Sequence, residues 1–175
     1  MQLKKTSIVL SLLATLALLF GGWFLYQKIQ IEEPIRAAIG QLESATLNDL
    51  KMDSEKITID VTVQDPEKFS FEYPELLEKT AKLAGDRNVV ISAANTSEEM
   101  RAIWHHGQFV FTEAVDLHQY SRIPQLMEEW KASHQLDEAF ALMDEDNIYV
   151  YMKKGSEDFY TIVSRSVENE VKANA

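Results

Sequence analysis

The sequence contains no cysteine, which excludes disulfide bonds, thiolate metal ligands and thiol nucleophiles together. Glycine is scarce, with six residues in 175, and the chain has no Gly-rich phosphate-binding loop, no Gly-x-Ser-x-Gly nucleophile motif and no His-Glu-x-x-His motif. The four prolines do not cluster into a linker. The chain must therefore be stabilised by its apolar core alone, and no common motif identifies it as an enzyme.

Basic residues are also few. Removing Lys4 and Lys5 from the 17 lysines and arginines leaves 15 against 28 aspartates and glutamates, so residues 27–175 carry a net charge of about −13. Such a surface repels phosphate backbones and anionic headgroups. We expect no nucleic-acid partner.

One long apolar run is present, at residues 8–26, and it follows Lys4 and Lys5. At about 1.5 Å rise per residue, a helix of this length matches the hydrocarbon core of a bilayer. Trp23 and Tyr26 then lie at the level of an interfacial aromatic belt. The sequence predicts a transmembrane anchor at 8–26, a cytoplasmic tip at 1–7 and an exported C-terminal domain.

A cleaved signal peptide is the alternative, because it also begins with a basic region before an apolar run. The small pair Gly21 and Gly22 is preceded by Leu19 and Phe20, which does not resemble a cleavage site. We favour the uncleaved anchor. The membrane is then the first partner of the chain, through residues 8–26.

Residues 27–50 are predicted to form a juxtamembrane stalk helix, with Pro34 in its first turn. Its apolar residues recur at helical spacing: Ile35, Ala38, Ile39 and Leu42. This stripe is either a self-association surface or a face packed on the chain's own domain, and we favour the second.

Residues 51–165 are predicted to form one exported α+β domain with a mixed sheet. Residues 56–63 alternate apolar and polar side chains, which is typical of a strand with one wet face. A helix is predicted from about Pro74 to Gly85, followed by a strand at 88–95. These elements form a β-α-β unit. Residues 138–165 predict an antiparallel meander whose interior strand lies at 148–152, and residues 166–175 predict a flexible tail.

A second β-α-β unit is expected fifty residues after the first. At that offset residues 59–62 match 109–112, and Tyr73-Pro74 matches Ile123-Pro124. The similarity reflects either an internal duplication or the features that any two β-α-β units have in common for physical reasons.

The stretch 103–118 contains three histidines, a glutamate and an aspartate. Residues 108–117 fit either a helix or a strand. We favour a strand, because Phe109 and Phe111 suit a pleated sheet and Gly107 can end a helix that begins near Ser97. In neither geometry do His105 and His106 have a metal-binding partner at a suitable spacing. We expect no metal and no other cofactor, with Trp104 in the core.

Asp116 and His118 are the only candidate catalytic residues. On a strand they would share a side, where they could act as orienter and base or share a metal ion, with Glu113 or His134 as a third partner. A plain surface pair is the favoured interpretation. The acidic run 144–147 is interpreted as a hairpin turn rather than a calcium loop, because it lacks the spacing of an EF-hand.

Three functions remain. The favoured one is a non-enzymatic, membrane-anchored, extracytoplasmic module that binds another protein or itself. The alternatives are a hydrolase or metal-dependent enzyme that uses Asp116 and His118, and a small-ligand sensor, for which a closed apolar pocket would be the sign.

The orientation of the anchor has a direct test. Lys4 and Lys5 lie before the apolar run, and basic residues stay on the cytoplasmic side, so we expect the C-terminus to be exported. Alkaline phosphatase fused after Ala175 should be active, and a fluorescent protein that matures only in the cytoplasm should stay dark. The reverse pattern would place the domain inside the cell.

Overall fold

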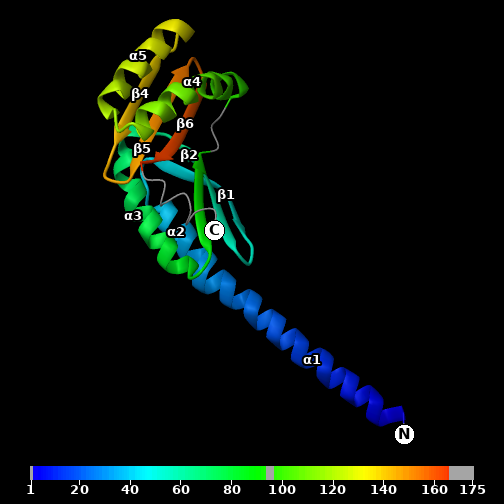
Figure 1. Ribbon diagram of the computed structural model, residues 1–175. Coiled ribbons are helices and arrows are strands. Elements are labelled where there is room, and N and C mark those ends of the chain that lie inside the picture. The colour runs from blue at the N-terminus through cyan, green and yellow to red at the C-terminus, as the bar shows by residue number, and fades with distance from the viewer. Residues whose placement is uncertain (1, 94–96, 166–175) are drawn as a thin grey trace.

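The computed structural model describes residues 2–93 and 97–165. Its fold is α+β, with a long N-terminal apolar helix, a mixed three-stranded sheet and an antiparallel three-stranded sheet (Figure 1). The N-terminal helical segments are α1 (Gln2–Gln27), the π-helical η1 (Lys28–Glu32) and α2 (Glu33–Gly40). The first sheet contains β1 (Ala45–Met52), β2 (Lys56–Val63) and β3 (Asn88–Ala93), with α3 (Pro66–Ala84) between β2 and β3. Then follow α4 (Glu98–Asp116), the 3-10 turn η2 (Tyr120–Arg122), α5 (Ile123–His134), β4 (Glu138–Met143), β5 (Asn147–Lys154) and β6 (Glu157–Ser164). The predicted tail at 166–175 lies outside the described residues.

α1, η1 and α2 follow one another without a break, and α1 projects away from the rest of the molecule (Figure 1). α1 is long and apolar enough to cross a membrane. Ile31, Ile35 and Ile39 are buried in the core of the domain, where α2 packs on α3. The stalk stripe is thus covered by the chain's own domain, as favoured from the sequence.

The predicted stalk helix at 27–50 is too long. The helix ends at Gly40, and residues 45–52 form β1, an antiparallel strand on β2. A bulge between Leu47 and Asp49 breaks its alternation, so the sequence pattern gave no strand signal. The turn signal was present in Asp53, whose Oδ1 accepts hydrogen bonds from the backbone N–H groups of Glu55 and Lys56.

The predicted β-α-β unit is confirmed: β2 and β3 are parallel neighbours and α3 connects them. The predicted helix start at Pro74 is wrong. α3 begins at Pro66, because Asp65 caps it by accepting a hydrogen bond from the Lys68 N–H at 3.0 Å. Pro74 lies inside the helix, and the helix ends at Gly85 as predicted.

The predicted meander is also confirmed, with β5 between β4 and β6. Successive side chains of a strand point to opposite faces, and both faces of β5 are buried. Tyr149 and Tyr151 face the core shared with α3, and Ile148, Val150 and Met152 face the core shared with α4 and α5.

The strand predicted at 108–117 is wrong, because these residues belong to α4. Ser97 caps α4 by accepting a hydrogen bond from the Met100 N–H at 3.1 Å, and Glu98 and Glu99 occupy its first turn. The buried residues of α4 recur at helical spacing: Met100, Ile103, Phe111, Ala114 and Val115. The offset of fifty residues therefore pairs strand residues 59–62 with helix residues 109–112. The expected second unit does not begin with a strand, so the structure does not support a duplication there.

Gly107 does not stop the helix. It is the point where Trp130 of α5 crosses α4, since a Cβ on Gly107 would lie 2.0 Å from the Trp130 ring. Glycine is therefore needed for the close packing of the two helices.

We predict opposite effects of alanine at two helical glycines. Gly107→Ala should destabilise the protein by about 1–3 kcal/mol, because Trp130 must move to admit the methyl group. Gly40→Ala meets nothing within 4 Å and should be neutral or stabilising, because alanine favours helix more than glycine. Thermal unfolding of the full-length protein in detergent, followed by circular dichroism, would measure both. Equal melting temperatures for the two variants would contradict the packing role of Gly107.

Candidate functional site

Asp116 and His118 do not form the pair expected from a strand. Asp116 is the last residue of α4, and His118 follows in a left-handed conformation with φ of 56°. Nδ1 of His118 lies 3.1 Å from the backbone oxygen of Asp116, and the imidazole packs edge-on against Tyr120. Both side chains are exposed. The geometry gives the catalytic hypothesis no support.

The other three histidines lie on two different helices. His105 and His106 are exposed on α4, and His134 is exposed at the end of α5. Across residues 2–93 and 97–165, no three His, Asp or Glu side chains are placed to hold a metal ion together. Trp104 packs on Phe111 and Phe159 and is half-buried at the edge of the core, whereas the sequence predicted it in the core.

The acidic run 144–147 forms the turn between β4 and β5, as predicted. Oδ1 of Asp144 accepts hydrogen bonds from the backbone N–H groups of Asp146 and Asn147, at 2.8 and 2.6 Å. Oδ2 of Asp144 accepts a hydrogen bond from the Tyr149 hydroxyl at 2.5 Å. The Arg165 guanidinium donates to the backbone oxygens of Asp144 and Glu145. Both carboxylate oxygens of Asp144 therefore accept hydrogen bonds that stabilise the turn and the start of β5.

Asp144 lies at the rim of a tyrosine cluster formed by Tyr73 of α3, Tyr149 of β5 and Tyr160 of β6. The ring of Tyr149 packs against the rings of Tyr73 and Tyr160 at 5.7 and 6.5 Å between centroids. Burial, with the nearby Asp144 carboxylate, raises the pKa of Tyr73 to about 12. Burial also raises the pKa of Tyr149 and Tyr160. Burial therefore disfavours the phenolate form of these three tyrosines, as expected for side chains packed in a core.

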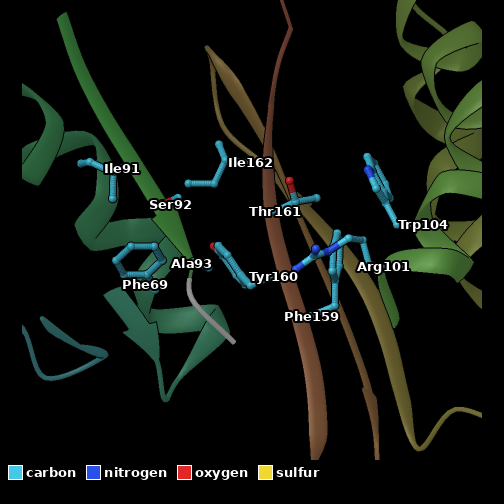
Figure 2. A pocket seen from close by; sticks show the side chains of 10 residues that line it. All are labelled: Phe69, Ile91, Ser92, Ala93, Arg101, Trp104, Phe159, Tyr160, Thr161 and Ile162. Atoms are coloured by element: carbon cyan, nitrogen blue, oxygen red, sulfur yellow. The ribbon is translucent and has the colours of Figure 1, made fainter. Parts of the chain in front are cut away.

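A hollow of about 300 Å³ lies between β3 and β6. Figure 2 shows Tyr160 and Ile162 of β6 on the side of β3 and Phe69, whereas Arg101 and Trp104 approach from α4. Its wall mixes apolar side chains with Arg101, Ser92 and Thr161, and it is partly open. It is not the closed apolar pocket that a small-ligand sensor requires.

The outward side of α4 is a feature that the strand prediction concealed. Phe109 is 78% exposed and Leu117 is 57% exposed, whereas the opposite face of α4 is buried. They border a shallow hollow with Gln108, Thr112, Glu113 and Asp116. We call these six residues, together with His105, the α4 outer face. The signal was available in the helical reading of 98–116, which leaves Phe109 outside the apolar stripe.

No protein-family model, no curated protein and no solved structure matches this chain.

Two tyrosine-to-phenylalanine variants separate the roles of the cluster. Tyr149→Phe removes the hydrogen bond to Asp144 and should cost about 2 kcal/mol, since hydrogen bonds to charged groups contribute about 1.5–3 kcal/mol. Tyr160→Phe removes a buried hydroxyl that has no hydrogen-bond partner within the described part of the chain, so the change should be neutral or stabilising. Chemical unfolding of the full-length protein in detergent measures both. A larger cost for Tyr160→Phe would refute this ranking.

Proposed function

We propose that this chain is a non-enzymatic, membrane-anchored protein whose extracytoplasmic domain docks a protein through the α4 outer face. The observation that carries the proposal is the exposure of Phe109 and Leu117 on one side of α4, beside a shallow hollow. Exposed apolar side chains at the rim of a concave surface are typical of protein-binding sites. Neither a catalytic nor a sensor function calls for such a surface.

The position of α4 supports this role. α1 extends from one end of the domain, and α4 and α5 lie toward the other end, on sheet β4–β6 (Figure 1). With α1 as the anchor, α4 is held away from the bilayer, where a partner can reach it. The apolar residues of α1 are themselves exposed from Ile8 to Tyr26, as a lipid-facing helix would be.

The acidic character of the domain narrows the kind of partner. Residues 27–175 carry a net charge of about −13, which opposes binding to nucleic acid and to anionic headgroups. The α4 outer face combines apolar contact with hydrogen-bonding side chains, so its partner should be a protein surface.

A photo-crosslinking amino acid at Thr112, in the centre of the α4 outer face, tests the proposal. In native membranes the full-length protein should give an adduct of discrete size. Phe109→Glu should reduce that adduct at least tenfold, because a buried charge at the contact costs several kcal/mol. The same amino acid at Ala132, exposed on α5, is the matched control and should give none.

An adduct from both positions, or one from Thr112 that persists in Phe109→Glu, would show that the α4 outer face does not dock a protein. Absence of any adduct from Thr112 would have the same meaning.

A further inference from the structure

We infer that the partner of the α4 outer face is a second copy of this chain, bound through an antiparallel pairing of α4 with α4. The inference rests on the proposed function, since it names the occupant of the same surface. It is carried by the spacing and the polarity of the residues along the helix.

The residues at the centre of the outer face recur at intervals of four, three and four: His105, Phe109, Thr112 and Asp116. All four are exposed, and the buried residues of α4 lie on the opposite side of the helix. Residues three and four apart lie on one side of a helix, so these four side chains form a row, which we call the seam, that a second helix can lie along. This helix therefore packs one side inside its domain and directs the seam to solvent.

Antiparallel pairing makes this seam self-complementary. His105 of one copy faces Asp116 of the second copy, and Phe109 faces Thr112. The same register places Gln108 opposite Glu113. A two-fold axis repeats each contact, as expected for an isologous dimer. Each carboxylate then meets a side chain that can donate a hydrogen bond to it.

Parallel pairing has the opposite consequence. It would place Asp116 against Asp116 and Glu113 near Glu113, and like charges in contact are unfavourable. Because each copy carries a net charge of −11, a homodimer needs an interface that avoids such contacts. The antiparallel register that pairs residue 105 with residue 116 avoids these contacts along α4.

Other charged groups near the outer face do not oppose the pairing. Arg122 of η2 lies 4.0 Å from Glu113, and Lys154 of β5 pairs with Glu99 near the start of α4. α5 also packs on α4, through Trp130 at Gly107, on the inner side of the helix. Among the four seam residues, His105 and Asp116 are titratable, and Glu113 flanks the seam opposite Gln108.

The contact is short. From residue 105 to residue 116 a helix rises about 17 Å, so the interface falls below the roughly 1,200 Å² of a stable dimer in solution. Anchors in one membrane raise the effective concentration of the two copies, which makes a weak contact sufficient. The dimer should therefore be measured in membranes with the full chain.

The native chain has no cysteine, so single-cysteine variants report on one position each. A short bis-maleimide should cross-link Thr112→Cys into a dimer in native membranes. Ala132→Cys is the matched control and should remain monomeric. Dimer from both variants at equal yield would reflect random collision and overturn the inference.

The orientation of the helices has its own readout. His105→Cys co-expressed with Asp116→Cys should give a cross-linked dimer, because the two positions face each other. His105→Cys alone should not, since antiparallel helices separate the two copies of residue 105 by about 16 Å along the axis. The reverse result would mean a parallel pairing and would contradict the proposed register.

A charge exchange tests the polar contact, in the Thr112→Cys background. His105→Asp should lower the dimer yield at least tenfold, because it places two aspartates together. His105→Asp combined with Asp116→His restores opposite partners and should recover the yield. Failure of the double variant to recover, with unfolding behaviour unchanged, would overturn the inference.

If Thr112 cross-links only to a different protein, the proposed function stands and the self-pairing is wrong.

Discussion

The packing of α3 across both sheets is the constraint on which the rest of the structure depends. Phe69 and Tyr73 form an aromatic ridge on α3, and this ridge packs edge-to-face on Tyr160 and Tyr149 at 5.5 and 5.7 Å. The same helix covers Ile57, Ile59 and Val61 of β2 within one core. A three-stranded sheet cannot bury both of its faces alone. The α3 ridge therefore joins two sheets that share no backbone ladder into one domain.

Because α3 covers one face of β5, the other face is left for α4 and α5. Trp104, Phe111 and Trp130 fill that side, and Gly107 lets the indole of Trp130 approach the α4 backbone. This second core needs only one side of α4. Its other side, with Phe109 and Leu117, is buried by nothing within the described chain. α4 therefore lies in the outermost layer of the fold, with one side against the core and the other side available to a partner.

The sequence predicted those elements whose signal is local. Three such signals were the alternation in β2, the turn at 144–146 and the glycine after α3. Each depends on the backbone preferences of neighbouring residues, and the structure has the predicted element at each position. β1 was missed because a bulge at Leu47 to Asp49 disrupts its period, and its pairing with β2 supplies the stabilisation that its composition lacks. For the candidate site, Asp116 and His118 were placed on a strand that does not exist.

By itself, the sequence determined the apolar N-terminal segment, the acidic surface, the β-α-β unit and the meander, because periodicity and turn chemistry report local backbone preference. Only the tertiary structure decided the state of residues 98–116. Their aromatic and β-branched residues favour a strand locally, and Gly107 resembles a helix stop. The contact of Gly107 with Trp130, which is distant in sequence, and the burial of Phe111 outweigh that preference. The α4 outer face follows from this decision, because Phe109 lies outside the apolar stripe only when residues 98–116 form a helix.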